Sequence, residues 1–105
     1  MATGSPFTER AGVDLHIHTS ASDGTDDPVS VMDLCIELNV GVVAVTDHDT
    51  LNALDAAENA GRERGITVVR GIEISAGFET RSIHILGLGI TEPDSAFLEM
   101  LRKIR

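Results

Sequence analysis

The architecture of this 105-residue chain follows from one segment, Val13-Asp14-Leu15-His16-Ile17-His18. Side chains two positions apart on an extended strand point the same way. The segment therefore predicts a strand over 13–18 with its polar side chains on one face and its aliphatic side chains on the other. The aliphatic face requires a core. The two imidazoles, rooted about 6 to 7 Å apart, can converge on one divalent ion.

Length and charge limit what such a strand can belong to. A chain of 105 residues forms one domain at most and is well short of a complete (β/α) barrel. Its 17 acidic and 8 basic residues give a net charge of −9, which argues against unaided binding to a nucleic-acid backbone. Divalent ions held by the acidic and imidazole groups would reverse that sign locally and allow a phosphate to bind.

The cysteine content and the start of the chain predict a cytoplasmic protein. Cys35 is the single cysteine, which excludes an intrachain disulfide and suits a reducing compartment. Its place on the apolar side of a predicted helix favours a core position over a ligand or nucleophile. Residues 1–12 are expected to form a flexible tail ahead of a domain over 13–105. Neither a signal peptide nor a membrane span is indicated.

Strands and helices are predicted to alternate along the chain. After a loop over 19–26, Asp27 is expected to cap a helix whose first residue is Pro28 and which ends at 39–41. Its apolar stripe has helical spacing: Val31, Leu34, Cys35 and Leu38. The continuous apolar run over 42–46 predicts a central strand that is buried on both faces.

The second half continues the pattern. A helix is expected to begin at Asp49 or Thr50 and to close at Gly65, and a short strand follows over 66–69. Extended segments over 71–78 and 82–90 are close enough to form a hairpin. A last helix over 94–105 is expected to bury four apolar side chains: Phe97, Leu98, Leu101 and Ile104.

The polar residues that carry chemistry collect where these strands end. In folds of repeated strand and helix units, the loops at the carboxyl ends of the strands carry the functional groups. His48 follows the strand over 42–46, and Asp23 lies in the loop after the first strand. Glu73 and His84 each lie between two isoleucines, so each faces away from the apolar set. The predicted metal ligands are six: His16, His18, Asp23, His48, Glu73 and His84.

Four motifs in order resemble the polymerase and histidinol phosphatase (PHP) superfamily, and within it the stand-alone metal-dependent phosphoesterases. They cover nearly everything between residues 13 and 90. The motifs are Asp14-Leu15-His16-Ile17-His18-Thr19 with Ser22-Asp23-Gly24, then Thr46-Asp47-His48-Asp49-Thr50, then Gly71-Ile72-Glu73-Ile74-Ser75, and His84-Ile85-Leu86-Gly87.

The resemblance implies an α/β fold, namely the amino-terminal portion of a distorted (β/α)7 barrel, with two or three divalent ions of manganese, iron or zinc. His16 and His18 would hold one ion, and Glu73 would bridge it to a second ion on His84. Asp23 and His48 would hold a third. Family members complete these sites with later histidines and an Asp-x-His, whereas this sequence has no histidine after His84.

The implied reaction is hydrolysis of a phosphoester by metal-activated water, which needs no side-chain nucleophile. Asp14, Asp47 and Asp49 are candidates to orient imidazoles through the second ring nitrogen or to protonate the leaving oxygen. The sequence does not choose among the three. Expected substrates are small phosphorylated molecules such as nucleoside bisphosphates or the ends of short RNA.

A second class of function is a non-catalytic metal-binding or assembly module that lacks the late barrel motifs. In either class, an incomplete barrel leaves a strand edge unpaired and one side of the core open. We therefore expect a homo-oligomer, in which neighbouring chains can supply missing ligands.

Overall fold

The computed structural model describes residues 10–78, 80–90 and 95–104. Four strands form one sheet in the order β1-β2-β3-β4. β1, β2 and β3 run parallel, and β4 pairs antiparallel with β3. The strands are β1 (Gly12–Ile17), β2 (Val40–Val45), β3 (Thr67–Phe78) and β4 (Arg81–Leu88).

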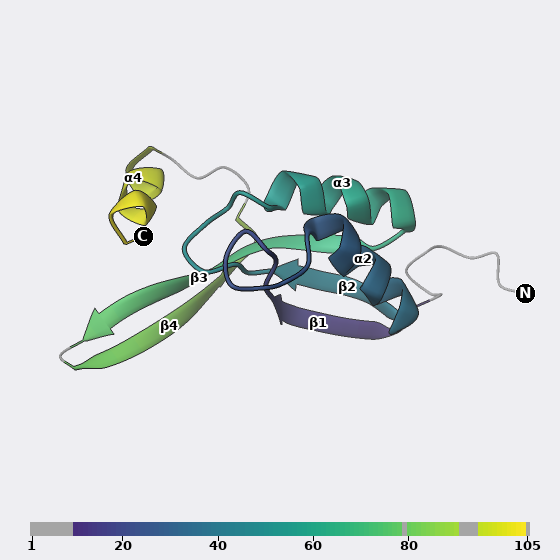
Figure 1. Cartoon of the computed structure of the whole chain (residues 1–105), viewed down its shortest axis with the longest axis horizontal. Helices are drawn as coiled ribbons and strands as arrows, with labels where there is room; N and C mark the ends of the chain where they lie inside the picture. Colours follow the sequence, from purple (N-terminus) through teal and green to yellow (C-terminus); the bar gives the residue numbers. More distant parts are fainter. Residues whose placement is uncertain (1–9, 79, 91–94, 105) are drawn as a thin grey trace, which may run out of the picture.

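Within the described ranges, three helices accompany the sheet: α2 (Pro28–Glu37), α3 (Leu54–Arg64) and α4 (Ser95–Ile104). α2 and α3 lie side by side on one face of the parallel strands, while α4 lies apart from both (Figure 1). The β3–β4 hairpin extends beyond the parallel strands as an arm. Strands that alternate with helices confirm the predicted α/β class.

The start of α2 agrees with the sequence. Asp27 Oδ1 accepts a hydrogen bond from the Ser30 backbone N–H at 2.8 Å, and Pro28 occupies the first turn. The predicted apolar stripe is only half right, because Leu34 and Leu38 are 43% and 65% exposed. Both line an open groove between α2 and β1, so the described residues leave this side of the helix uncovered.

The core lies between β2 and the two helices that cover it. Val43, Ala44 and Val45 have no exposed surface, which confirms β2 as a strand buried on both faces. Met32 and Leu54 contribute the largest fully buried side chains from the helices. Cys35 is 5% exposed within this core, as its position on the helix predicts.

The aliphatic face of β1 does not meet the core as predicted. Ile17 packs against the core cluster, but Val13 and Leu15 are 61% and 43% exposed. β1 is an edge strand whose one neighbour in the sheet is β2. Nothing in the described part of the chain covers its outer half.

Two predicted boundaries are wrong for local reasons. α3 begins at Leu54 and not at Asp49 or Thr50, since Asp49 takes a positive φ of 54° and its carboxylate bonds the Ser75 N–H instead of capping a helix. The two extended segments predicted over 66–69 and 71–78 form one strand, β3. Its first part pairs with β2 and its second part with β4.

The remaining predictions concern the ends of the elements and of the chain. Gly65 closes α3 in the left-handed conformation, with a φ of 71°. Leu98 of α4 is 45% exposed and not buried as predicted, whereas Leu101 is 5% exposed. Most of the predicted tail, residues 1–9, lies outside the described residues, as do 94 and 105 of the predicted last helix.

The described end of the predicted tail belongs to the fold. The Arg10 guanidinium donates to the Arg64 carbonyl at 3.3 Å, and the Gly12 N–H bonds the Asn39 carbonyl at 3.0 Å. These bonds join Arg10 to the end of α3 and Gly12 to the residue before β2. Within the described ranges, no helix combines the length and hydropathy needed to cross a bilayer.

Candidate metal centre

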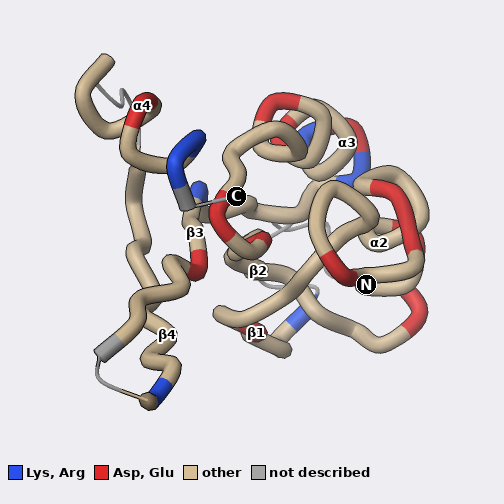
Figure 2. The backbone as a smooth tube through the Cα atoms, turned by 60° about the vertical axis from the view of Figure 1, so that its left-hand side comes forward, with Lys and Arg blue, Asp and Glu red and all other residues tan. Residues whose placement is uncertain are grey.

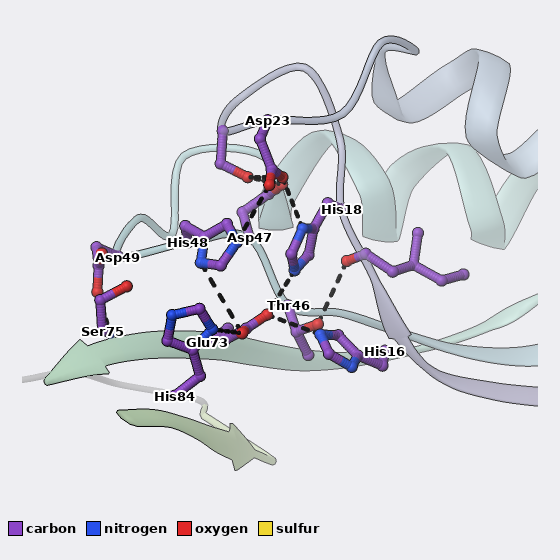
Figure 3. A network of polar contacts seen from close by, with 12 residues as sticks. His16, His18, Asp23, Thr46, Asp47, His48, Asp49, Glu73, Ser75 and His84 are labelled. Atoms are coloured by element: carbon purple, nitrogen blue, oxygen red, sulfur yellow. Dashed lines mark hydrogen bonds and ion pairs between the residues drawn. The ribbon is translucent and has the colours of Figure 1, made fainter. Parts of the chain in front are cut away.

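All six predicted ligands come together beside the carboxyl ends of β1 and β2, against the middle of β3 (Figure 3). The four imidazoles form a row, with ring centroids 5.2 Å apart for His16 and His18, 4.4 Å for His18 and His48, and 5.3 Å for His48 and His84. Segments from four parts of the chain thus supply one cluster.

Glu73 occupies the middle of this cluster and is 4% exposed. Its Oε1 lies 2.7 Å from His16 Nε2 and 2.7 Å from His18 Nε2. Its Oε2 lies 2.7 Å from His84 Nδ1 and 4.0 Å from His48 Nδ1. Each carboxylate oxygen therefore faces a different pair of imidazoles, which is the arrangement expected of a carboxylate that bridges two ions.

Asp23 spans the two central imidazoles from the opposite side. Its Oδ1 lies 2.6 Å from His18 Nδ1, and its Oδ2 lies 3.2 Å from His48 Nε2. The cluster thus divides into three overlapping groups whose ligand atoms lie within 4.8 Å of one another: His16, His18 and Glu73; His18, Asp23 and His48; and His48, Glu73 and His84.

Backbone pairing aligns His48 with Glu73. The Glu73 N–H donates to the Asp47 carbonyl at 3.0 Å, and the Asp49 N–H donates to the Glu73 carbonyl at 2.9 Å. Asp49 Oδ1 also accepts from the Ser75 N–H at 2.7 Å. The segment after β2 therefore continues alongside β3 and fixes His48 at the level of Glu73.

Asp47 holds the loop that carries Asp23, a role that the sequence did not reveal. Its carboxylate is buried, at 1% exposure, and accepts from the Thr19 N–H at 2.6 Å, the Thr19 hydroxyl at 2.7 Å and the Ser22 hydroxyl at 2.7 Å. A Cβ at Gly24 would lie 2.7 Å from the His18 carbonyl oxygen, so the same loop needs glycine at this position.

The three candidate orienting carboxylates make their hydrogen bonds to groups other than imidazoles. Asp14 Oδ1 accepts from the nearby His16 backbone N–H at 3.1 Å. The side-chain oxygens of Asp47 and Asp49 bond the Thr19, Ser22 and Ser75 groups just described. At His18 both ring nitrogens face other carboxylates, Nε2 that of Glu73 and Nδ1 that of Asp23.

The cluster shifts the ionisation of its own members. Burial alone would raise the pKa of Glu73, but hydrogen bonds with His16 and His18 outweigh it and hold the pKa at about 2. Burial likewise opposes the charged form of His18, yet its bonds to Glu73 and Asp23 raise the pKa above 6.5. Desolvation of Asp23 is outweighed by the bond with His18, so the pKa of this carboxyl is lowered.

Negative charge elsewhere lies mainly on α2, α3 and the loops before them, as Figure 2 shows, while the hairpin carries little. The donors of the cluster itself are imidazole nitrogens and carboxylate oxygens, which suit zinc, manganese and iron. The donor set therefore fits divalent transition-metal ions.

Comparison with known proteins places the chain in a family. The family model for the PHP domain matches residues 14–99. The chain belongs to the PHP family, as its four motifs indicate.

Individual relatives agree with this placement. The chain is 41% identical to a 5'-3' exoribonuclease of Haemophilus influenzae over 95 residues, which cover 88% of this chain and 35% of the relative. It is 37% identical to a 3',5'-nucleoside bisphosphate phosphatase of Chromobacterium violaceum, with 90% and 33% covered. It is 46% identical over 81 residues to a phosphoribosyl 1,2-cyclic phosphate 1,2-diphosphodiesterase of Eggerthella lenta, with 75% and 31% covered.

Solved structures share the fold. An amidohydrolase from Chromobacterium violaceum superposes with a TM-score of 0.84 at 36% identity, over 90% of this chain and 33% of that one. A Bifidobacterium adolescentis protein described as a metal-dependent phosphoesterase gives 0.81 at 31% identity, over 90% and 34%. The sheet and its helices thus match the amino-terminal portion of a PHP-type barrel. The chain spans about a third of these relatives' length.

Proposed function

We propose that this chain carries metal-binding machinery of a phosphoesterase that hydrolyses small phosphorylated substrates with metal-activated water. His16, His18 and Glu73 would hold one ion. Glu73 would bridge it to a second ion held by His84, and Asp23 with His48 would hold a third. Two or three ions of manganese, iron or zinc are proposed. When bound, such ions supply Lewis acidity and make water acidic enough to lose a proton near neutral pH.

One observation supports this function most directly: the two oxygens of a nearly buried carboxylate face two separate pairs of imidazoles. A histidine cluster formed by chance at a surface has no reason to centre on one carboxylate with 4% exposure. Paired ions are the arrangement that stabilises the attacking and leaving oxygens of an in-line displacement at phosphorus.

The chain's own groups would prepare the site before any substrate arrives. Asp47 fixes the Asp23 loop through three hydrogen bonds, and the backbone on either side of His48 is paired with β3. Glu73 and Asp23 set the orientation of the His18 ring from both of its nitrogens. Ligands held in advance lose less conformational entropy when ions and substrate bind.

The names of the relatives favour phosphoesters as substrates, such as nucleoside bisphosphates or the ends of short RNA. Bound ions would also bring positive charge to a chain with a net charge of −9, and this would allow a phosphate to approach. A second candidate is a metal-binding module without catalysis, for which the three ligand groups within the described residues would suffice.

Release of phosphate from a nucleoside 3',5'-bisphosphate in the presence of manganese tests the proposal. Turnover is expected to depend on the metal and to be abolished by His16→Ala. Glu37→Ala, at the end of α2 and outside the cluster, serves as the control and should leave turnover unchanged. Stoichiometric metal binding without turnover of any phosphoester would favour the second candidate instead.

A further inference from the structure

The β3–β4 hairpin carries His84 but has little packing of its own to hold that residue in place. β4 lies at the edge of the described sheet with β3 beside it, and every residue of β4 except Gly87 is exposed. A two-stranded hairpin by itself is only marginally stable in water. The hairpin projects from the parallel strands (Figure 1), so the position of His84 depends on how the base of the hairpin is fixed.

Arg70 closes the base of the hairpin with both its backbone and its side chain. Its carbonyl accepts hydrogen bonds from the Gly89 N–H at 2.7 Å and the Ile90 N–H at 3.0 Å. Its guanidinium Nε donates to the Ile90 carbonyl at 3.0 Å. These bonds lie just beyond Gly71 and Leu88, the pair at the base of the hairpin. One residue of β3 therefore holds the chain that leaves β4.

The same guanidinium links this base to α3. Arg70 Nη1 lies 3.0 Å from Asp55 Oδ1 and 2.5 Å from Glu58 Oε1, and the side chain of Arg70 is 19% exposed. α3 is anchored in the core, since Leu54 and Ala57 are 1% and 0% exposed. Isolated exposed ion pairs contribute little to stability. This guanidinium, however, is largely covered and joins two carboxylates and a backbone carbonyl through charge-assisted bonds.

We propose that Arg70 is a positioning residue for the second ion: by fixing the hairpin to α3, it keeps His84 beside Glu73, where the two would hold that ion. The proposal rests on the metal-dependent function proposed above. His84 Nδ1 lies 2.7 Å from Glu73 Oε2, and Glu73 follows Arg70 on the same strand. The ligand group of His16, His18 and Glu73 contains no residue of β4, so it should not depend on Arg70.

Arg70→Ala and Arg64→Ala form a matched pair of variants for the test. The side chain of Arg64 is similarly covered, at 21% exposure, and its ion pairs are with Asp33 of α2 at 2.7 Å and with Glu63 of α3 at 3.5 Å. Each variant therefore removes a guanidinium that contacts α3, but only Arg70 also bonds the end of the hairpin. The measurements on the full chain are NMR spectra of the imidazole rings during titration with zinc, and amide hydrogen exchange without metal.

In Arg70→Ala, zinc binding at His84 is expected to weaken about tenfold, while the His16 and His18 signals respond as in the parent chain. Without metal, the amides that pair β4 with β3 are expected to exchange about tenfold faster, whereas those that pair β1 with β2 keep their rates. Arg64→Ala should change neither the His84 response nor the exchange of β4.

The proposal is overturned if Arg70→Ala leaves the His84 response or the exchange of β4 unchanged, or if the responses of His16 and His84 weaken equally. If zinc shifts no imidazole of the parent chain, the metal-dependent function fails, and the exchange rates alone decide whether Arg70 positions His84. Faster exchange of β4 in Arg70→Ala would then support this role, and unchanged exchange would overturn it.

Discussion

Glu73 and His18 show how single residues set the properties of the centre without metal. The pKa of the Glu73 carboxyl is about 2, because hydrogen bonds from two imidazoles outweigh the effect of its burial. The carboxylate therefore stays ionised at any pH well above this value. His18 faces a carboxylate at each ring nitrogen, at 2.7 Å and 2.6 Å, and its pKa is raised. Without metal, the protonated His18 ring therefore supplies the positive charge beside these carboxylates that a bound cation would otherwise supply.

Metal affinity is expected to increase with pH as a consequence. An ion requires the unprotonated His18 ring, and the raised pKa keeps that ring protonated to a higher pH than a free imidazole. Below the raised pKa, affinity should fall by about tenfold per pH unit for each proton displaced. Titration calorimetry with zinc between pH 6 and 8 measures this. An affinity that does not change across this range would contradict the assignment of His18 as a ligand.

At the residue scale, the sequence located the cluster but not its supports. Alternation along a strand and position after a strand are local properties, so they were enough to single out residues such as His16, His48 and Glu73. The contact of Asp47 with Thr19 joins residues 28 positions apart in sequence. No periodicity encodes such a contact, and Asp47 was therefore only one of three candidates for orienting an imidazole or protonating the leaving oxygen.

At the scale of elements, the loop between β1 and α2 is the part that Asp47 stabilises. The loop brings Asp23 to His18 and His48, and it is closed by hydrogen bonds from the Ser22 and Gly24 N–H groups to the Thr19 carbonyl at 3.1 Å and 2.9 Å. The conformation of this loop, more than that of a strand, determines whether the third ligand group exists.

Two replacements of Asp47 distinguish the effect of its hydrogen-bonding geometry from the effect of its charge. Asp47→Ala should lower the free energy of unfolding by about 1 to 3 kcal/mol, because it leaves buried donors of Thr19 unpaired. It should also weaken metal binding at Asp23. Asp47→Asn should preserve most of both, since its amide can donate to the Thr19 hydroxyl while its oxygen accepts the other bonds.

Chemical denaturation and calorimetry of the two variants measure these effects, with Asp26→Ala, an exposed position, as the control. If Asp47→Ala and Asp47→Asn lower the free energy of unfolding and the metal affinity equally, the charge of Asp47 matters more than its hydrogen-bonding geometry. Unchanged metal binding in Asp47→Ala would contradict the anchoring role.

Elements whose ends depend on local chemistry were the most predictable. Asp27 and Gly65 mark helix ends through contacts within a few residues, and both lie where expected. The start of α3 was wrong because Asp49 bonds to Ser75, which is 26 positions away. The continuity of β3 was missed because it changes partner from β2 to β4 near Gly71, a change set by the whole sheet.

For the whole molecule, the open edges of the sheet are the main departure from a closed barrel. Val13 on β1 and Ile85 on β4 are 61% and 52% exposed, on the two outer strands of the four-stranded sheet. Exposed aliphatic side chains on edge strands favour pairing with further strands. The homo-oligomer expected from the sequence stays a prediction. The exposure of side chains such as Val13 could not be foreseen from the sequence, because it depends on what lies next to each edge of the sheet, whereas the burial of β2 was foreseen.

The account depends on Glu73 joining separate ions into one centre. Elemental analysis of the chain equilibrated with manganese or zinc and freed of excess metal, beside Glu73→Gln, tests this most directly. Two or three ions per parent chain are expected, with a marked loss in the variant because Glu73 belongs to two of the three ligand groups. Less than one ion per parent chain, or equal metal content in Glu73→Gln, would contradict the account.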